Sequence, residues 1–530
     1  MAGTAGKPGS STATSTPTGD DGMNAGHEET LRSGTSTTEK KKENEKKLIN
    51  LLRGWPSPKM LPIAQLRAAA TRVLSDADPA VSVPALQYGP DPGYQPLREE
   101  LARWLTRQYY QYQYQSPEVV ETRMFSADEI AITGGASQSL ACILQSFSDP
   151  GYTRAVWAVA PCYYLACPIF EDAGFAGRLR AVPEDEGGID LKFLERRLRE
   201  VDDEAGDESG LKETLFKHPA PYRKVYRHII YLVATSANPS GKTLSLARRE
   251  QLVHLARTHN ALIISDDVYD MLQWPTSAPR SLSDTPPPLP LLSQLDLSFP
   301  PSRHDPPGLR FSHAVSNSSF SKLVGPGTRT GWIHASRDFV FGFSQTGSNR
   351  SGGAASQLSA AMIYQLMVAG DLDAHLSGTV RPALRRRHGL IVDAVQRELG
   401  PLGVEVWGAN GTGGAGTGPV VEGDGVFGGY FIWLTLPEGM PDAEEIAGWA
   451  KEENLIVAPG RLFEVSGDEE AARFPRNIRL CFSWENEEDI LEGVRRLGEV
   501  MRRKREGSVR GTTGEKAGRF QIGADGMQYS

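Results

Sequence analysis

Four short polar motifs carry side chains that could do chemistry, and each follows an apolar run typical of a strand. They are Thr-Gly-Gly-Ala-Ser-Gln at residues 133–138, Ala-Asn-Pro-Ser-Gly at 237–241, Ser-Asp-Asp-Val-Tyr at 265–269 and Ser-Phe-Ser-Lys at 319–322, the last followed seven positions after its lysine by Arg329. Open parallel sheets place their ligand crevice beyond the carboxyl ends of their strands. Position alone therefore makes these motifs candidates for one site.

Taken one at a time, each motif has an ordinary structural explanation beside the chemical one. Glycines between a strand and a helix could leave backbone N–H groups free for a phosphate, or they could simply form a turn. Asn-Pro-Ser-Gly is typical of a β-turn. Asp266 at the end of a buried strand needs a positive partner, unless its loop is solvated. Lys322 alone would be interpreted as a surface charge.

Together, the motifs supply the groups that pyridoxal 5'-phosphate (PLP) requires. This cofactor offers an aldehyde that a lysine amine can capture, a phosphate that needs donors and positive charge, and a pyridine nitrogen that must stay protonated to draw electrons. Lys322 matches the first need, and the Gly-rich turn with Arg329 matches the second. Asp266 matches the third, because a carboxylate beside the pyridine nitrogen favours the protonated, cationic form.

The elements that position these motifs are predicted to form a parallel sheet. Short β-rich apolar runs alternate with helical patterns, which is the signature of βαβ units. The strand candidates are residues 130–133, 155–160, 228–234, 261–265 and 313–316. One unit is complete between residues 228 and 265, because a helix capped by Ser245 and ended by Asn260 separates two of these runs.

The chain is predicted to fold into two domains between polar tails. We expect a disordered N-terminal tail over residues 1–46, a segment joining the small domain over 47–80, a large cofactor-binding domain over 81–345, a small C-terminal domain over 346–503 and a disordered tail over 504–530. The tails lack the apolar residues that would offset chain entropy. The small domain rests on a long helical segment around residues 385–387, followed by strands near 429–436 and 478–482.

Three stretches break this pattern of strands and helices. They are the acidic residues 202–210, the Pro-rich residues 276–308 and the Gly-rich residues 408–425. Long unstructured insertions in a compact domain are usually surface excursions. We therefore expect three loops without a catalytic role.

Composition argues against several other classes of protein. The formal charge of -8 and a pI near 5.8 offer no basic surface for nucleic acid, and no apolar run is long enough for a membrane span. The four cysteines, Cys142, Cys162, Cys167 and Cys481, lack zinc-site spacing, so we expect reduced thiols and no metal. The polar N-terminus resembles neither a secretory signal nor a transit peptide, which indicates a cytoplasmic protein.

The motifs, taken in order, resemble those of class I/II aminotransferases of fold type I, and within them the fungal branch similar to 2-aminoadipate and aromatic aminotransferases. The resemblance runs from about residue 47 to about 500 and includes Gln-Tyr-Gly-Pro-Asp-Pro-Gly-Tyr at 87–94, the Asn-Pro-Ser-Gly turn, Ser-Phe-Ser-Lys and Arg479 in Asn-Ile-Arg-Leu. It implies an α/β, aspartate-aminotransferase-like fold: a large domain with a mostly parallel seven-stranded sheet and a smaller α/β domain.

The resemblance also implies roles around the cofactor ring. Lys322 would bond to the PLP aldehyde and then carry the proton between substrate and cofactor. Asp266 would pair with the pyridine nitrogen, since its spacing to Tyr269, rather than that of Asp267, matches the family. Tyr269 and Asn238 would hydrogen-bond the ring hydroxyl oxygen. Tyr163 would stack on the ring face, although the adjacent Tyr164 is the alternative core aromatic.

Further residues would hold the phosphate and the substrate. The phosphate ligands would be Ser319, Ser321, Arg329 and the amides of Ala136 and Ser137, where many relatives have serine in place of the alanine. Tyr88 would reach the phosphate bound to the neighbouring subunit, which implies a homodimer with shared active sites. Arg479 would clamp the substrate α-carboxylate through its two-pronged donor geometry. Arg53 and Gly54 would line the substrate side-chain pocket.

The expected reaction moves the amino group of an amino acid, 2-aminoadipate or an aromatic one, to a 2-oxo acid such as 2-oxoglutarate. Another PLP reaction on the same scaffold stays open, such as C–S β-elimination or cyclopropane-carboxylate synthesis. A regulatory protein with an aminotransferase-like domain is a third interpretation. It is disfavoured because the first 46 residues are too short and too polar for a winged helix.

Overall fold

The computed structural model describes residues 46–75, 79–115, 124–204, 215–275, 288–353, 355–406 and 426–509. Residues 1–47 and 48–530 form two units, and the elements below all belong to the second. The predicted N-terminal tail up to residue 45 and residues 510–530 of the C-terminal tail lie outside the described residues. So do residues 205–210 of the acidic insertion, residues 276–287 of the Pro-rich insertion and the whole Gly-rich insertion.

The main sheet has the strand order β2-β10-β9-β7-β6-β3-β4-β5. Its strands are β2 (Ile130–Thr133), β3 (Ala155–Ala160), β4 (Leu179–Asp185), β5 (Gly188–Ile189), β6 (His228–Leu232), β7 (Ala261–Asp266), β9 (Ala314–Ser319) and β10 (Gly331–His334). Neighbours from β4 to β9 are parallel, and β10 is antiparallel to both β2 and β9. The five predicted strands are all present, and the short β5 makes the sheet eight-stranded rather than seven-stranded.

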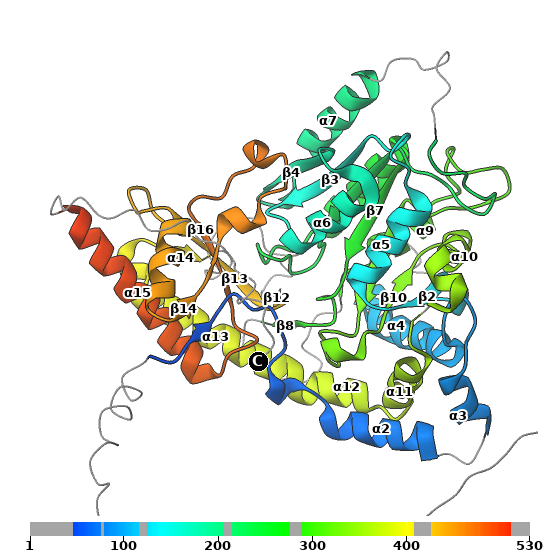
Figure 1. Cartoon of the computed structure of the whole chain (residues 1–530), viewed down its shortest axis with the longest axis horizontal. Coiled ribbons are helices and arrows are strands. Elements are labelled where there is room, and N and C mark those ends of the chain that lie inside the picture. The colour runs from blue at the N-terminus through cyan, green and yellow to red at the C-terminus, as the bar shows by residue number, and fades with distance from the viewer. Residues whose placement is uncertain are drawn as a thin grey trace, which may run out of the picture. The chain divides into compact units, whose positions relative to one another are not determined.

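Helices cover both faces of this sheet because its strands are apolar on both sides. Along β7, Leu262 and Ile264 pack in one buried cluster with Phe147 of α5 (Ala136–Phe147), whereas Ile263 packs in another with Leu252 of α8 (Leu246–Thr258). Strands buried on both faces are typical of parallel α/β sheets. Figure 1 shows α5 and α6 (Cys167–Phe170) beside the strands.

The predicted helix between β6 and β7 is confirmed as α8. The hydroxyl of Ser245 accepts a hydrogen bond from the backbone N–H of Arg248 at 3.3 Å, as an N-cap does. The other helices are α2 (Ile63–Ser75), α3 (Pro79–Leu86), α4 (Gln95–Gln115), α7 (Leu191–Glu204), α9 (Leu292–Ser298), α10 (Arg337–Ser344), α11 (Gln357–Val368), α12 (Asp371–His375), α13 (Arg381–Glu398), α14 (Ala443–Glu452) and α15 (Glu487–Val509). Among the described residues, no helix combines the length and apolar character needed to cross a bilayer.

Two of the predicted loops contain helical residues, so the loop prediction was wrong for residues 202–204 and 292–298. The Pro-rich insertion contains α9, whose Leu292 and Leu295 are buried and whose Asp296 pairs with Arg257 at 2.7 Å. Apolar side chains three positions apart bury this helix although prolines precede it. In the acidic insertion, Asp202 lies on α7 and accepts a hydrogen bond from Arg227 at 2.8 Å.

A second sheet lies C-terminal in the sequence, with the order β11-β13-β16-β15. Its strands are β11 (Glu405–Val406), β13 (Phe431–Thr435), β15 (Ala458–Pro459) and β16 (Asn477–Cys481), and two short pairs accompany it: β1 (Ile49–Asn50) with β14 (Leu455–Ile456), and β8 (Gln273–Pro275) with β12 (Val426–Gly428). Strands β13 and β16 confirm the two predicted runs. The pairing of β1 with β14 joins the N-terminal segment to this part of the chain.

Helix α15 continues to Val509, beyond residue 503, where we placed the end of the small domain. The first residues of the predicted C-terminal tail are therefore helical. The other domain boundaries stay predictions, because the second unit is not divided further.

Candidate active site

The four motifs meet at one edge of the main sheet. Strands β6, β7 and β9 are parallel neighbours, and β2 runs in the same direction because β10 is antiparallel to both β2 and β9. Gly331 of β10 is paired with Thr133 on one side and with Ser319 on the other. The carboxyl ends of the motif-bearing strands thus lie together, as predicted.

The Gly-rich motif and Arg329 form a cradle at the start of α5. The guanidinium of Arg329 donates to the carbonyl of Gly134 at 2.9 Å, and Gly135 has a φ of 104°. A Cβ at Gly135 would lie 2.8 Å from the Arg329 Nη2, so a side chain here would displace the guanidinium. The first N–H groups of a helix lack intrahelical partners and attract anions. Ala136 and Ser137 supply such groups here.

Two serines complete the cradle on the β9 side. The Ser319 hydroxyl donates to the Ser321 hydroxyl at 2.8 Å and accepts from the Ser321 backbone N–H at 3.1 Å. Exposed Arg329, the two hydroxyls and the helix N-terminus therefore surround one position. Such a set of donors and positive charge fits a phosphate group.

Asp266, the last residue of β7, is buried with one oxygen unsatisfied. The Tyr231 hydroxyl donates to its Oδ2 at 3.0 Å, whereas its Oδ1 is buried and has no partner within the described residues. Burial raises the pKa of Asp266 to about 6, against the hydrogen bond from Tyr231 and the charge of Lys322. An acceptor in this state fits a protonated pyridine nitrogen.

Lys322 lies three residues after the end of β9 and is half-buried. Its Nζ donates to the carbonyl of Gly54 at 2.7 Å and lies 5.1 Å from the centre of the Tyr430 ring. Burial lowers the pKa of Lys322 to about 8, and the charge of Arg479 adds to this effect. The amine is therefore easily deprotonated, which a nucleophile or a base requires.

Arg479 of β16 is a buried cation without a carboxylate partner in the described part of the chain. Its Nη1 donates to Asn238 Oδ1 at 2.8 Å, its Nη2 donates to the carbonyl of Leu52, and its Nε has no partner there. The guanidinium carbon lies 4.0 Å from the ring centre of Phe431. A buried charge is costly unless it is paired, so this arrangement fits an incoming carboxylate.

The two candidate stacking tyrosines have different neighbours. The Tyr164 ring packs edge-on against Phe463, with 5.8 Å between the centroids. Tyr163 is half-buried, and burial raises the pKa of its hydroxyl, with the negative charge of Asp266 adding to the effect. The Tyr163 hydroxyl is therefore close enough to Asp266 for the carboxylate charge to raise its pKa.

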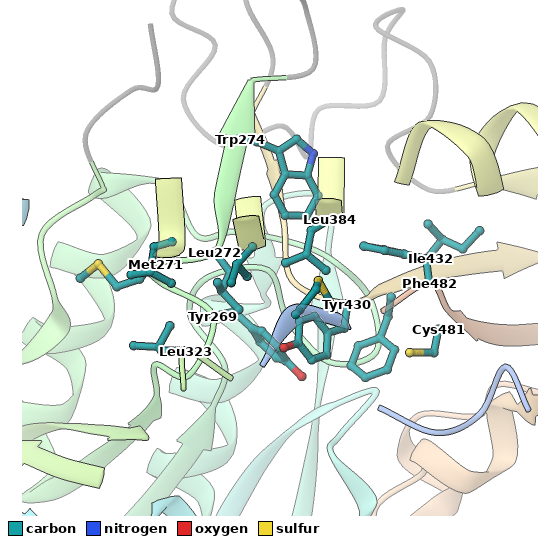
Figure 2. Packing of buried hydrophobic residues seen from close by; sticks show 14 of the residues in the cluster. Tyr269, Met271, Leu272, Trp274, Leu323, Leu384, Tyr430, Ile432, Cys481 and Phe482 are labelled. Atoms are coloured by element: carbon teal, nitrogen blue, oxygen red, sulfur yellow. The ribbon is translucent and has the colours of Figure 1, made fainter. Parts of the chain in front are cut away.

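Tyr269 lies among aromatic side chains beside Asp266. It is buried, and its ring lies 5.5 Å from that of Tyr430. Figure 2 shows these two rings next to each other within the apolar cluster. Burial raises the pKa of the Tyr269 hydroxyl.

Two predicted residues are not brought to the centre of the site in the single chain. Tyr88 is 86% exposed and lies against Gly352, where an added Cβ would come within 2.7 Å of its ring. The guanidinium carbon of Arg53 lies 4.7 Å from the Trp55 ring and 5.2 Å from the Trp484 ring. Gly54 is closer to the centre, because its carbonyl contacts the Lys322 amine.

Several residues beside the site were not predicted from the sequence. They are Tyr231, which holds Asp266, Tyr430, which lies beside Lys322, and the rings of Phe431 and Phe463, which flank Arg479. Apolar or aromatic character in a strand is the ordinary mark of a core residue. No local signal in the sequence distinguishes these four from other core positions.

Comparison with known proteins identifies the family. Residues 62–497 match the family model of aminotransferase class I and II, so the chain belongs to this family. The chain is thus a PLP-dependent transaminase, and the predicted class and cofactor are confirmed. It is similar to the uncharacterized protein YER152C of Saccharomyces cerevisiae, with 33% identity over 470 residues, covering 86% of this chain and 97% of the yeast protein.

Two further relatives carry names with substrates. Aromatic-amino-acid aminotransferase 1 of Thermococcus litoralis is 26% identical, over 86% of this chain and 88% of its own. The 2-aminoadipate transaminase of Thermus thermophilus is 27% identical, over 86% and 90%. The multiple substrate aminotransferase of Thermococcus profundus superposes with a TM-score of 0.63 at 24% identity, over 90% of this chain and 96% of its own. Neighbours of this kind confirm the predicted aspartate-aminotransferase-like fold.

Proposed function

We propose that this transaminase takes the amino group from 2-aminoadipate or an aromatic amino acid and passes it to a 2-oxo acid such as 2-oxoglutarate. The observation that carries the proposal is the buried, unpaired Arg479 near the amine of Lys322. An amino acid and a 2-oxo acid both present a carboxylate next to the reacting carbon. Arg479 would bind that carboxylate in both halves of the reaction.

When bound, PLP supplies an aldehyde that accepts the amino group and a ring that withdraws electrons from the substrate Cα. Lys322 would bond to the cofactor and, once released, move the proton at the substrate Cα. Asp266 would hold a proton on the pyridine nitrogen, with Tyr231 fixing the carboxylate. Tyr269 and Asn238 would donate to the ring hydroxyl oxygen, and Tyr163 would cover the ring.

The phosphate would be held by the cradle described above. Ser319, Ser321 and Arg329 would donate from one side, and the amides of Ala136 and Ser137 would donate from the helix N-terminus. Because the cradle requires no side chain at residue 136, the alanine there is compatible with this role.

Residues 52–54 would rearrange when the site fills. Lys322 and Arg479 each donate to a carbonyl of this segment, that of Gly54 and that of Leu52. Both hydrogen bonds compete with the proposed roles of the two cations. We infer that the segment shifts when the cofactor and the substrate carboxylate bind, which would bring Gly54 and Arg53 into contact with the substrate.

The proposed donor class rests on Arg53 and its aromatic neighbours. The Arg53 guanidinium lies against two indole rings, Trp55 and Trp484, whose centroids are 5.5 Å apart. A cation beside indole rings can pair with a distal carboxylate, while the rings can stack on an aromatic side chain. The relatives named for 2-aminoadipate and for aromatic amino acids agree with this pairing of chemistries.

A donor screen of the purified holoenzyme with 2-oxoglutarate tests the proposal. We expect 2-aminoadipate, tyrosine or both to give a higher kcat/KM than aspartate and alanine. A preference for aspartate or alanine would overturn the proposed donor class while leaving the family assignment intact.

Replacing Arg53 with alanine is expected to cost roughly 2 kcal/mol or more of transition-state stabilisation with 2-aminoadipate and much less with tyrosine, the scale of a charge-assisted hydrogen bond. The measurement is kcat/KM for both donors in both proteins. Arg505→Ala is a matched control, because this arginine is exposed on α15, outside the substrate site and the apolar helices α2, α3 and α11. Equal losses of kcat/KM with the two donors would show that Arg53 does not bind the distal carboxylate of the substrate.

We also propose a homodimer with shared active sites. Large apolar side chains are exposed on three helices that pack together, α2, α3 and α11. They are Ile63 at 67%, Leu74 at 53%, Val83 at 50%, Leu86 at 62% and Val368 at 47%. Tyr88, at 86% exposed, directly follows α3 in sequence. Exposed apolar patches of this kind mark interaction surfaces.

If Tyr88 completes the site of the neighbouring subunit, mixing inactive Lys322→Ala and Tyr88→Ala parents should restore activity. Each heterodimer would contain one intact site and one site with both defects. Subunit exchange would be followed by native mass spectrometry in the same sample. Exchange without recovered activity would show that Tyr88 acts within its own subunit or not at all.

We also propose a cytoplasmic location, which cell fractionation would test.

A further inference from the structure

Two buried carboxyls on the segment that carries Tyr269 have no role in the proposed chemistry. Asp267 directly follows β7 and is 5% exposed, and Asp270 is 4% exposed. The backbone N–H of Asp267 donates to the carbonyl of Asn317 at 3.0 Å, and that of Asp270 donates to the carbonyl of Asp267 at 3.3 Å. The two residues therefore anchor the turn on either side of Tyr269.

Each carboxyl has one oxygen with a well-formed hydrogen bond and one without a partner of good geometry. The hydroxyls of Ser316 and Thr235 lie close enough to lower the pKa of Asp267 and of Asp270 respectively. The Ser265 hydroxyl donates to Asp267 Oδ1, and the Tyr109 hydroxyl donates to Asp270 Oδ2 at 2.9 Å. Asp267 Oδ2, Asp270 Oδ1 and the indole nitrogen of Trp332 are buried and have no partner within the described residues. Leaving three buried polar atoms unpaired would be costly.

These three residues line the same small cavity. Its volume is about 10 Å³, and Leu105, Met271, Leu291 and Leu323 provide most of the apolar wall. Figure 2 shows Met271 and Leu323 on the side of the apolar cluster next to Tyr269. A cavity of roughly 10–15 Å³ with two to four polar partners can hold one water molecule. Size and polarity therefore both fit a single bound water.

Charge balance sets how many protons the pair holds. Among the described residues, the charged or titratable groups that face it are Arg249 of α8, Tyr109 of α4 and the adjacent Asp266. Arg249 is completely buried and spends its donors on neutral oxygens, including the Thr235 hydroxyl at 2.7 Å and the carbonyl of Pro290 at 2.9 Å. One buried cation balances one carboxylate, and a second ionised carboxylate would be uncompensated.

We propose that Asp267 and Asp270 share one proton across a single buried water that also accepts from Trp332, and that this pair positions the segment carrying Asp266 and Tyr269. The protonated carboxyl and the indole N–H donate to the water, and the water donates to the ionised carboxylate. The single ionised carboxylate of the pair and the positive charge of Arg249 then cancel. It lies behind the cofactor site, since Ser319 of the phosphate cradle lines the same cavity.

The pKa directions agree with one retained proton. Burial raises the pKa of Asp267 well above its ordinary value, and the negative charge of Asp270 adds to this effect. Burial also raises the pKa of Asp270, whereas Arg249 opposes the shift. The remaining negative charge on Asp270 raises the pKa of Asp266 slightly further, after the larger effect of burial. The pair thus influences the residue proposed to hold the pyridine nitrogen.

Three variants of the holoenzyme test the proposal: Asp267→Asn, Asp270→Asn and the double replacement. Each single variant mimics the one-proton pair, so we expect its melting temperature to lie near that of the wild type at about pH 4, where the wild-type pair keeps its proton without loss of stability. The double variant leaves Arg249 without a carboxylate. Its melting temperature should fall by several times the sum of the two decreases seen in the single variants. Asp296→Asn is a matched control, because Asp296 is buried and pairs directly with Arg257 at 2.7 Å. That single replacement should be destabilising. Additive losses in the double variant would overturn the shared proton.

A pH series separates this proposal from a purely structural role. A carboxyl with a raised pKa keeps its proton in the folded state only, so wild-type stability should fall as pH rises above about 4, by about tenfold in the folded-to-unfolded ratio per unit. The loss stops above the folded-state pKa. Asp267→Asn removes this titration, so the melting-temperature difference between wild type and variant should shift in favour of the variant as pH rises. A difference independent of pH would contradict the proposal.

Two further measurements address the positioning role and the water. The pH midpoint of the visible cofactor absorbance should be unchanged in each single variant and lower in the double variant, which lacks the negative charge behind Asp266. An unchanged pH midpoint in a folded double variant would contradict the proposed influence of the pair on Asp266. A crystal structure should show one water between the two carboxyls and Trp332. Carboxyls in direct contact without it would exclude the bridging water.

Discussion

Replacing Lys322 with alanine is expected to abolish transamination, with a loss of more than about 10⁴-fold in kcat, and to remove the visible absorbance of the bound cofactor. The physical reason is that Lys322 supplies the reactive amine, whose pKa burial lowers to about 8. The replacement removes a hydrogen bond to Gly54 and little else, so the melting temperature should stay close to that of the wild type.

Borohydride reduction followed by mass spectrometry checks this result directly. In the wild type the cofactor mass should remain on the peptide that contains Lys322, and in the variant no lysine should carry it. Lys192→Ala, an exposed lysine on α7, provides a control that should behave like the wild type. Cofactor mass on another lysine of the reduced wild-type protein would show that the wrong residue was assigned.

Replacing Asp266 with asparagine is expected to lower kcat by at least about 100-fold while changing the affinity for PLP far less. Asparagine cannot keep the pyridine nitrogen protonated, so the ring withdraws electrons weakly, whereas the phosphate cradle and Lys322 still hold the cofactor. The Tyr231 hydroxyl can still donate to the amide oxygen, so the local packing should persist. Turnover and PLP dissociation would be measured on the same preparation.

Asp267→Asn is the natural control for this experiment, because it makes the same replacement one position further on. It should leave turnover close to that of the wild type. Near-normal turnover in Asp266→Asn together with a large loss in Asp267→Asn would show that the other acid serves the cofactor.

Much of the fold was predictable because the strands of the main sheet are short, apolar and bounded by turn residues. Strands β2 and β3 have the predicted limits, and Ser245 caps α8 as expected. Strand β4 was missed because Arg180 and Pro183 interrupt its apolar run. Helix α9 was missed because prolines precede it. In both cases tertiary packing overrides the local signal.

The central residues of the site were predictable for a different reason. Lys322 and Asp266 belong to polar motifs that follow apolar strand-like runs, and these motifs together match the needs of PLP. Arg479 was expected only from the resemblance to aminotransferases. Their partners were not predictable in this way. Tyr231, Tyr430 and Trp332 are aromatic residues in or beside strands, and their contacts join residues far apart in the chain.

The exposed position of Tyr88 marks a limit of another kind. Its proposed role depends on a second subunit, so the single chain leaves it 86% exposed. The charge sharing between Asp267 and Asp270 likewise depends on Arg249, Tyr109 and Trp332, which come from three other elements. Contacts between side chains from distant parts of the chain, or from two subunits, cannot be predicted from the local sequence pattern.

The most direct test of the central claim is a pair of half-reactions followed by absorbance on the purified holoenzyme. Adding 2-aminoadipate or tyrosine without an oxo acid should convert the visible band of the bound cofactor stoichiometrically to that of its amino form, and adding 2-oxoglutarate should restore it with formation of glutamate. The same donor should release no ammonia. Release of ammonia with each turnover, or a visible band that no oxo acid restores, would contradict amino transfer and favour an elimination reaction on the same fold.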